Sequence, residues 1–335
     1  MAYYFGVDGG GSKTVCAIAD SNGDLISIGQ SGSANYKLVG TEAAQRNILE
    51  SVQQAQHRAN IRMNELECGF FAVSGLDGNE DRNIIDRFIK EVSPTDNYGL
   101  DNDSIASLTL GTSDGHGVVL ICGTGSNCVA VNKQSNRLQV GGLGREFGDF
   151  CGGREIAIQA MGAAVRGWDG RGPATTLYES ITKYLGIENL ADFTPILHSS
   201  GRSYPIANLV PLVFDAAEQG DQVALDILRY NGEELALSAK VAIEKLFQDE
   251  EEIEVVLTGG VFRRDVNRIL IDALQNKLMS ECPWVKFRIP SGEPVIGAVI
   301  EAMRRDGVVV TAEHKERLVR QLATFQDIVG EFQVG

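Results

Sequence analysis

Two glycine-rich segments of the same design are the feature that most constrains this chain. Residues 7–14 read Val-Asp-Gly-Gly-Gly-Ser-Lys-Thr, and residues 121–128 read Ile-Cys-Gly-Thr-Gly-Ser-Asn-Cys. Each follows a short apolar run and leads into another β-prone stretch, which predicts a tight turn between two strands. Glycine lets a backbone approach a phosphate closely, and successive N–H groups form an anion-binding concavity. Two such hairpins facing each other would hold a polyphosphate from both sides.

The composition indicates a folded, acidic protein. With 335 residues, 43% of them hydrophobic, the chain is long enough for two domains. A net charge of −15 argues against nucleic acid and against an anionic membrane surface as partners, since both attract clustered Lys and Arg. No uncharged apolar stretch of about 18 residues occurs, so no membrane span is expected. Without a basic-then-apolar leader, a cytoplasmic location is expected. The six scattered cysteines are expected to be reduced thiols.

The hydrophobic patterning predicts a duplicated order of elements. Strands are expected at 3–7, 15–19 and 25–28, then a helix at 41–59, a strand at 69–73, a helix at 81–92, a strand at 98–100 and a helix from 104. The order restarts with strands at 118–121, 128–131 and 137–140, followed by helices at 154–166, 175–185, 206–218 and 222–247. The predicted order ends with a strand at 253–258, a helix at 264–279, a strand at 285–289, a helix from 295 and a helix at 311–325.

Two duplicated halves of this size predict an α/β fold with two lobes and a cleft between them. The helical region from 154 to 247 would be a large insertion in the second lobe. We therefore expect residues 1–112 to form the first lobe, completed by the C-terminal helix at 311–335. Residues 113–310 would form the second lobe.

Three further motifs accompany the two glycine-rich segments. The first, Asn102-Asp103-Ser104, follows a short predicted strand and opens a helix. The second is a glycine-rich turn at residues 141–149, and the third, at residues 257–262, runs from a strand into a diglycine. In this order, the five motifs resemble those of the sugar kinase, Hsp70 and actin ATPase superfamily. Within it, the chain looks most like the N-acetylglucosamine kinases and the BadF/BadG/BcrA/BcrD-type ATPases. The resemblance spans about residues 3–303. It implies two RNase H-like (actin-like ATPase) lobes with an interlobe cleft.

The resemblance also implies a site for ATP and Mg²⁺. The nucleotide would contact Gly9, Gly10, Gly11, Ser12, Lys13, Thr14, Gly123, Thr124, Gly125, Ser126, Gly259 and Gly260. The last two would lie against the adenosine. Asp8 would orient water on Mg²⁺, because a carboxylate beside a phosphate is unfavourable unless a hard cation lies between them. Each glycine-rich segment alone also fits a plain turn, so the prediction depends on their order and spacing.

By the same resemblance, Asp103 would be the catalytic base. A sugar hydroxyl is a poor nucleophile, and a carboxylate within hydrogen-bond reach can orient it and take its proton. Alternatively, Asn102 or Asp103 caps the helix that begins near Ser104, and both roles can hold together. Asp101 is a neighbouring carboxylate that matches no family position.

The sugar-binding residues implied by the resemblance come from several segments. They are Asn35, Ser74, Gly75, Asn127, Gly144 and Asp149. Loop asparagines and serines are more often structural, so each is weak evidence alone. The chain departs from the family at 150–152, where Phe-Cys-Gly stands in place of Glu-Gly-Ser. That departure leaves the identity of the sugar open.

The leading interpretation is an ATP-dependent kinase acting on the 6-hydroxyl of an amino sugar. N-acetylglucosamine, glucosamine and N-acetylmuramic acid all fit, and Lys37 or Arg145 could meet the carboxylate of the last. A homodimer is the family expectation. The alternative is an ATPase that activates a radical dehydratase through a shared iron–sulfur cluster. Cys122 and Cys151 are its candidate ligands, although neither lies in the sequence context of those proteins.

Overall fold

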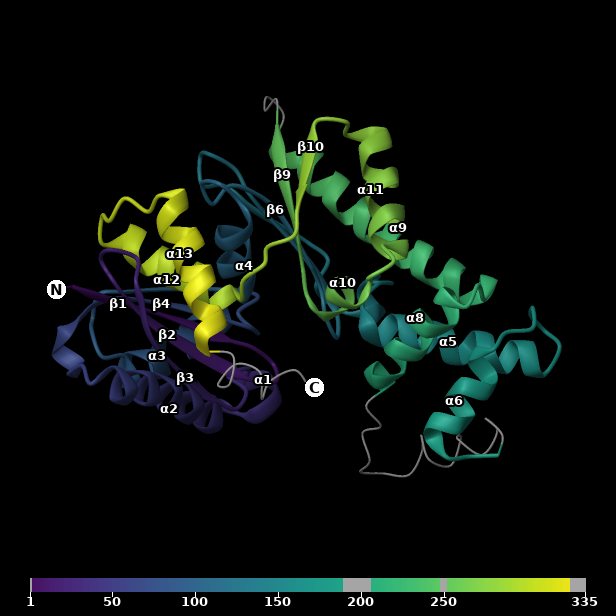
Figure 1. Ribbon diagram of the computed structural model, residues 1–335, viewed down its shortest axis with the longest axis horizontal. Helices are drawn as coiled ribbons and strands as arrows, with labels where there is room; N and C mark the ends of the chain where they lie inside the picture. Colours follow the sequence, from purple (N-terminus) through teal and green to yellow (C-terminus); the bar gives the residue numbers. More distant parts are fainter. Residues whose placement is uncertain (1, 189–205, 248–251, 326–335) are drawn as a thin grey trace. The chain divides into compact units, whose positions relative to one another are not determined.

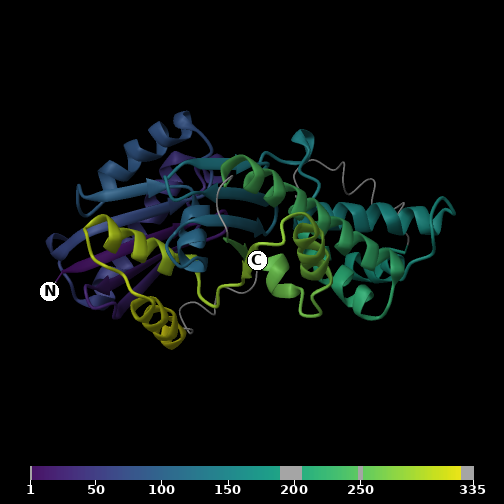
Figure 2. The same cartoon turned by 90° about the horizontal axis from the view of Figure 1, so that it is seen from above.

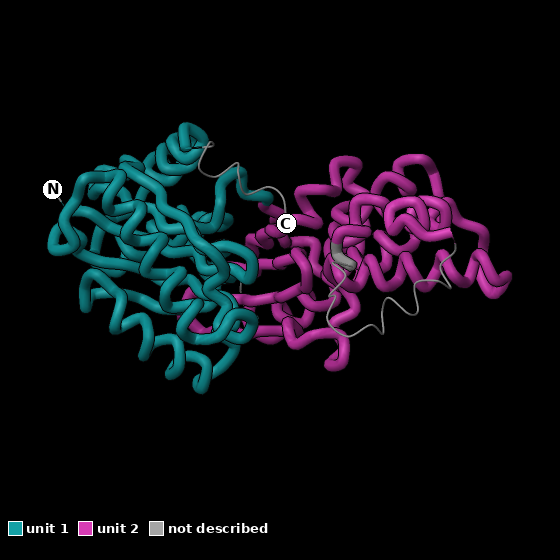
Figure 3. The backbone as a smooth tube through the Cα atoms, turned by 90° about the horizontal axis from the view of Figure 1, so that it is seen from below, with its two compact units in different colours: residues 1–116, 289–335 teal, residues 117–288 magenta. Residues whose placement is uncertain are grey.

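The computed structural model describes residues 2–188, 206–247 and 252–325 (Figure 1). The chain divides into two compact units (Figure 3). Unit 1 consists of residues 1–116 and 289–335, and unit 2 consists of residues 117–288. Among the described residues, no helix combines the length and the apolar character needed to cross a membrane.

Unit 1 is built on a five-stranded sheet in the order β3-β2-β1-β4-β5. The strands are β1 (Tyr3–Gly9), β2 (Thr14–Asp20), β3 (Leu25–Ser31), β4 (Leu66–Val73) and β5 (Tyr98–Asp101). The first three form an antiparallel meander, whereas β4 and β5 run parallel to β1. The ends of β1, β4 and β5 that point toward the C-terminus therefore lie along one edge of the sheet.

Helices cover both faces of this sheet. Successive side chains of β1 point to opposite faces, so apolar residues on each face pack against a different helical layer. Phe5 and Val7 pack with α2 (Thr41–Ala59) and α3 (Asn79–Val92). Tyr4 belongs to the core on the other face, which α4 (Asp103–Gly111), α12 (Pro294–Arg305) and α13 (Ala312–Leu322) complete. Figures 1 and 2 show the yellow C-terminal helices against the purple N-terminal strands. Shorter elements are α1 (Tyr36–Val39), η1 (Met63–Glu65) and η5 (Ala323–Phe325).

The division of the chain differs from our expectation at residues 289–310. We expected them in the second lobe, but α12 packs within unit 1. A side chain at Gly297 would place its Cβ 1.8 Å from the carbonyl oxygen of Ala106 on α4, and one at Gly6 would lie 2.3 Å from the backbone nitrogen of Val299. Small residues on α12 and β1 thus permit a backbone approach that determines where this helix belongs.

Unit 2 repeats the plan of unit 1, with strand order β10-β9-β6-β7-β8. Its strands are β6 (Gly117–Cys122), β7 (Ser126–Val131), β8 (Arg137–Val140), β9 (Ile253–Thr258) and β10 (Val285–Arg288). Again an antiparallel meander is extended by two parallel strands. The predicted α/β fold with duplicated halves is confirmed.

The helical insertion of unit 2 lies between β8 and β9, as expected. It contains η2 (Arg145–Phe147), α5 (Gly153–Trp168), α6 (Leu177–Leu185), η4 (Ile206–Leu209), α8 (Val210–Glu218) and α9 (Gln222–Leu246). After β9 come α10 (Gly260–Arg264) and α11 (Ile269–Glu281). Asp221 caps the N-terminus of α9, and its carboxylate accepts a hydrogen bond from the Ala224 N–H at 3.1 Å. Apolar side chains of these helices and of the sheet form one continuous core.

Candidate functional site

The first glycine-rich segment forms the predicted tight turn in unit 1. Gly9 pairs with Thr14 across the β1–β2 hairpin, and the Gly10 N–H donates to the Lys13 carbonyl at 2.8 Å. Ser12 is exposed at the turn. Thr14 differs from the expectation, since its side chain is fully buried and its hydroxyl donates to the Gly32 carbonyl at 2.7 Å. Its hydroxyl therefore secures the loop from within.

Three segments of unit 1 meet at this turn. The Ala34 N–H donates to the Gly10 carbonyl at 3.1 Å, and the Ser74 N–H donates to the Gly9 carbonyl at 2.8 Å. Gly75 has φ +84°, and a Cβ there would lie 2.9 Å from the side-chain oxygen of Asn35. The Asn35 side chain also caps α1. The structure thus brings Asn35, Ser74 and Gly75 together beside the glycine turn, as the sequence predicts for residues of one site.

The Asn102-Asp103 motif lies along the same edge of the sheet. Asn102 is buried and caps α4, its side-chain oxygen accepting from the Ser104 N–H at 3.0 Å. Its side-chain amide donates to the Leu76 carbonyl at 3.2 Å, which links the motif to the loop after β4. Asp103 is then the first residue of α4 and is half-buried. One residue caps the helix while the next occupies its first turn, where the helix dipole stabilises a carboxylate.

The neighbouring carboxylate, Asp101, lies at the end of β5 and not in α4. It ends β5, accepts a hydrogen bond from the Asn102 N–H at 2.7 Å and lies 3.8 Å from the guanidinium of Arg82. Arg82 also donates to the Leu100 carbonyl at 2.7 Å. The ion pair gives Asp101 a partner on α3.

The second glycine-rich segment forms the equivalent turn in unit 2. Its Gly123 N–H donates to the Gly125 carbonyl at 2.9 Å, and the first N–H groups of α5 donate to the Gly123 and Thr124 carbonyls at 2.8 Å. A Cβ at Gly123, Gly125 or Gly260 would meet no atom within 4 Å. These three predicted nucleotide positions therefore border open space. Thr124 is exposed on the same turn.

Two other glycines let neighbouring segments approach this turn. Gly259 has φ +116°, and a Cβ there would lie 2.3 Å from the Cys122 carbonyl oxygen. Gly152 has φ +110°, and its Cβ would lie 2.7 Å from the carbonyl carbon of Gly125. Both positions therefore require glycine, for backbone conformation and for space. The sequence indicates the first of these, in the diglycine motif, but not the second.

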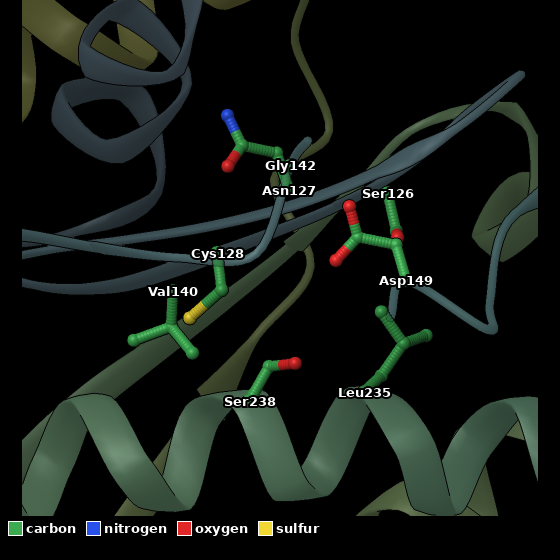
Figure 4. A pocket seen from close by; sticks show the side chains of 8 residues that line it. All are labelled: Ser126, Asn127, Cys128, Val140, Gly142, Asp149, Leu235 and Ser238. Atoms are coloured by element: carbon green, nitrogen blue, oxygen red, sulfur yellow. The ribbon is translucent and has the colours of Figure 1, made fainter. Parts of the chain in front are cut away.

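Asn127 and Asp149 both line a small pocket of unit 2 (Figure 4). One Asp149 carboxylate oxygen accepts from the Leu143 and Gly144 N–H groups, both at 2.6 Å. The side-chain oxygen of Asn127 is buried without a hydrogen-bond partner. The pocket is lined by Ser126, Asn127, Cys128, Val140, Gly142, Asp149, Leu235 and Ser238. The predicted sugar residues of unit 2 are thus brought together.

Sequence reasoning missed several residues around this pocket. The Cys151 thiol donates to the Ser126 hydroxyl at 3.1 Å, and burial raises the pKa of Cys151 to about 11. Leu235 and Ser238 come from one face of α9, which carries no motif. Ser126 was predicted to bind phosphate through its hydroxyl, and that oxygen already accepts the Cys151 hydrogen bond. Such contacts join segments far apart in the chain, so no local sequence pattern predicts them.

Known proteins resemble this chain over most of its length. The profile of the BadF/BadG/BcrA/BcrD ATPase family matches residues 5–302. An N-acetylmuramic acid/N-acetylglucosamine kinase of Clostridium acetobutylicum is 30% identical over 90% of this chain and 98% of its own length. An N-acetyl-D-glucosamine kinase of Dictyostelium discoideum is 29% identical over 90% of this chain and 97% of its own. A glucosamine kinase of Vibrio cholerae is 24% identical over 71% of this chain and 79% of its own.

Solved structures share the fold. A Chromobacterium violaceum protein for which N-acetylglucosamine kinase activity has been suggested superposes with a TM-score of 0.69 at 24% identity, covering 90% of this chain and 98% of that one. A ROK-family glucokinase of Streptomyces griseus, solved with glucose and AMPPNP, has a TM-score of 0.55 at 16% identity, covering 90% and 100%. Together with the family profile, these likenesses agree with the sequence motifs and with the duplicated sheets. The chain belongs to the BadF/BadG/BcrA/BcrD ATPase family.

Proposed function

We propose that this protein is an ATP-dependent amino-sugar kinase that transfers the γ-phosphate to the 6-hydroxyl of N-acetylglucosamine or a related amino sugar. One observation carries the proposal most: a single sheet edge of unit 1 holds the glycine turn after β1, the Ser74 loop after β4 and the Asp103 motif after β5. Phosphate donor, acceptor hydroxyl and base would need this proximity. The names of the three curated relatives agree with it.

The nucleotide would be held by backbone rather than by side chains. Each unit contributes one glycine turn whose N–H groups suit phosphate oxygens. Gly123, Gly125 and Gly260 border open space, which leaves room for a ligand against the backbone. Loops of this kind bind phosphate without a large cluster of cations, consistent with a net charge of −15.

Asp8 offers the oxygen donor that a bound Mg²⁺ prefers. It lies next to last in β1, directly before the glycine turn, and is half-buried. Mg²⁺ is usually held by one or two carboxylates, by water and by substrate phosphates, which fits a single carboxylate at this place. The ion would neutralise charge on the transferred phosphate.

Asp103 would act as general base. It lies in the first turn of α4, and an ionised carboxylate is the form that accepts a proton. In the reaction it would orient the 6-hydroxyl and accept its proton as the new P–O bond forms. Asn102 would position it through the cap and the hydrogen bond to the Leu76 carbonyl.

The sugar would be bound by Asn35, Ser74, Gly75, Asn127, Gly144 and Asp149. Two of these side chains carry buried oxygens with no partner in the described structure, the Ser74 hydroxyl and the Asn127 amide oxygen. A buried polar atom without a partner is costly, and sugar hydroxyl or amide groups would satisfy it.

The test is sugar-dependent ADP release with Mg²⁺ on a panel of hexoses, amino sugars and N-acylated sugars. We expect one amino sugar to stimulate release and Asp103→Asn to lower kcat by about 10²–10⁴-fold with an unchanged melting temperature. Asp101→Asn is the matched control, because an asparagine there can still accept the Asn102 N–H, and it should retain most activity.

Activity that survives Asp103→Asn would refute the catalytic-base assignment. ATP hydrolysis that ignores every sugar would favour the activator ATPase instead. The candidate cluster ligands of that alternative, Cys122 and Cys151, are both buried, and burial raises the pKa of both thiols. A homodimer and a cytoplasmic location stay predictions, and light scattering of the purified protein would test the first.

A further inference from the structure

The loop that carries Asp149 is folded around that residue's own carboxylate. One Asp149 oxygen accepts from the Leu143 and Gly144 N–H groups, both at 2.6 Å. A Cβ at Gly141 would lie 2.4 Å from the other oxygen, so the turn closes tightly over the carboxylate. Residues 143–148 are exposed, and an exposed loop has few buried contacts to hold its conformation. The position of Asp149 therefore depends on what anchors this loop to the body of unit 2.

Two side chains of α5 anchor the loop on both sides of Asp149. The Glu155 carboxylate pairs with the guanidinium of Arg145, four residues before Asp149. The Gln159 amide donates to the Phe150 carbonyl, directly after Asp149, at 3.4 Å. Glu155 and Gln159 are four residues apart, so they lie on one face of the helix. That face therefore holds both ends of the loop.

The anchor continues into the core of unit 2. Glu155 is 6% exposed, and the Gln159 amide also donates to its carboxylate at 3.4 Å. The side-chain oxygen of Gln159 accepts from the Asn231 amide of α9 at 2.8 Å. Asn231 is fully buried, and its amide also donates to the Ile227 carbonyl at 2.8 Å. A chain of polar contacts therefore runs from the exposed Arg145 to the middle of α9.

Stability alone does not account for these polar contacts. Replacing a buried ion pair by apolar residues of similar volume is often neutral or stabilising. The side-chain oxygen of Asn231 is buried without a partner among the described residues, which costs stability. An apolar residue there would avoid that cost. The contacts are suited instead to fix the direction of the side chains that they join, since each hydrogen bond has a preferred geometry.

We propose that Glu155 and Gln159 are positioning residues that fix the Asp149 carboxylate for sugar binding. The inference rests on the proposed kinase function and extends its sugar site to two side chains outside the sequence motifs. All of the contacts that carry it lie within unit 2. Neither side chain needs to touch the sugar, because each acts through the loop that holds Asp149.

The same helix also supports the second glycine turn, which gives the proposal a distinguishing measurement. The Gly153 and Arg154 N–H groups at the start of α5 donate to the Gly123 and Thr124 carbonyls, both at 2.8 Å. A general loss of α5 would therefore raise KM for ATP as well as KM for the sugar. Loss of the anchor alone should raise KM for the sugar and leave KM for ATP unchanged.

The first experiment compares Glu155→Gln with the parent on the sugar that the parent phosphorylates most efficiently. Glutamine keeps the shape of the side chain but loses the charge that strengthens its bond to Arg145. We expect KM for the sugar to rise about threefold to tenfold, while KM for ATP stays within about twofold. Glu254→Gln is the matched control, because Glu254 is also poorly exposed and pairs with the half-exposed Arg288 at 2.8 Å. It should leave both KM values unchanged.

The second experiment asks whether the two residues act through Asp149. Gln159→Met removes the bond to the Phe150 carbonyl and should raise KM for the sugar in the same way. In an Asp149→Asn background, Glu155→Gln should change KM for the sugar by less than about twofold, because the group to be positioned is already lost. An unchanged KM for the sugar in either single variant, or a full Glu155→Gln effect in the Asp149→Asn background, would overturn the inference.

Hydrogen exchange of peptides spanning residues 141–150 tests the anchor without any sugar. We expect the segment to exchange at least about threefold faster in Glu155→Gln than in the parent, and at the parent rate in Glu254→Gln. Equal exchange in Glu155→Gln and the parent would overturn the inference while leaving the kinase function standing. Failure of the kinase function would show separately, as a parent protein that phosphorylates no sugar on the panel.

Discussion

At the scale of single residues, Asn102 and Thr14 show how buried side chains shape the loops of the candidate site. Asn102 uses its oxygen to cap α4 and its amide to bind the Leu76 carbonyl, so one buried side chain joins two loops. Thr14 uses its hydroxyl on the Gly32 carbonyl. Both satisfy backbone groups that would otherwise be buried without partners. Loop positions at this sheet edge therefore depend on interior hydrogen bonds.

The contribution of the Asp81 carboxylate to stability can be tested through its dependence on pH. Burial would raise the pKa of Asp81, but hydrogen bonds from Tyr36, Lys37 and the Asp77 N–H hold it below 3.8 in the folded protein. Its contribution to stability is then fully present above pH 3.8 and is lost as pH falls through the lower folded-state pKa. We expect Asp81→Asn to lower the free energy of unfolding by about 1–2 kcal/mol at pH 7, with a difference that shrinks below about pH 4.

Urea denaturation of both proteins between pH 7 and pH 3 measures this difference. Asp86→Asn is a useful comparison, since its carboxylate accepts from Tyr98 away from the sugar-binding segments. A parent–variant difference that stays constant or grows toward pH 3 would contradict the linkage.

At the scale of elements, the start of α5 depends on the glycine before it. Gly152 has φ +110°, and an alanine Cβ there would lie 2.7 Å from the Gly125 carbonyl carbon. We expect Gly152→Ala to displace the second glycine turn, to lower the free energy of unfolding by about 1–3 kcal/mol and to raise KM for ATP.

Gly162→Ala, inside the same helix, is the matched control. It is exposed, a Cβ there meets nothing within 4 Å, and alanine is the better helix former. It should stabilise the protein by about 0.5–1 kcal/mol and leave KM for ATP unchanged. Chemical denaturation and steady-state kinetics of the pair separate local strain from a general loss of helix. Equal stability of the two variants would refute the steric argument.

At the scale of the whole molecule, the chain repeats one plan, and each repeat begins with a glycine turn at its first hairpin. If these turns bind nucleotide, ATP with Mg²⁺ should stabilise the native protein by about 2.7 kcal/mol at a hundred times Kd. A chelator should remove most of this stabilisation, because the Asp8 carboxylate then meets the phosphates without a cation between them.

Thermal unfolding in ATP with Mg²⁺, in ATP with EDTA and in Mg²⁺ alone measures this coupling. Mg²⁺ alone serves as the control for ionic strength. An equal rise in Tm with and without EDTA would argue against a metal-assisted site at Asp8.

Much of the fold could be predicted because its signals are local. Glycine turns, alternating apolar residues and caps such as Asn102 and Asp221 act over a few residues, and they place most strands and helices near their observed bounds. The resemblance also implies that the first glycine-rich segment, Ser74 and Asp103 belong to one site. The second antiparallel meander could be predicted for the same reason, since it repeats the pattern of the first.

Only the tertiary structure decided which distant groups meet. Residues 289–310 join unit 1 because Gly297 and Gly6 allow α12 to approach α4 and β1, a packing match that neither segment reveals alone. The pairing of Lys37 with Asp77 and Asp81, the Cys151–Ser126 hydrogen bond and the burial of Thr14 likewise depend on chain folding over long separations. The sequence by itself determined the duplicated elements and the kind of chemistry, since both follow from short-range patterns. Side-chain partners and unit membership follow from long-range packing, which no local pattern specifies.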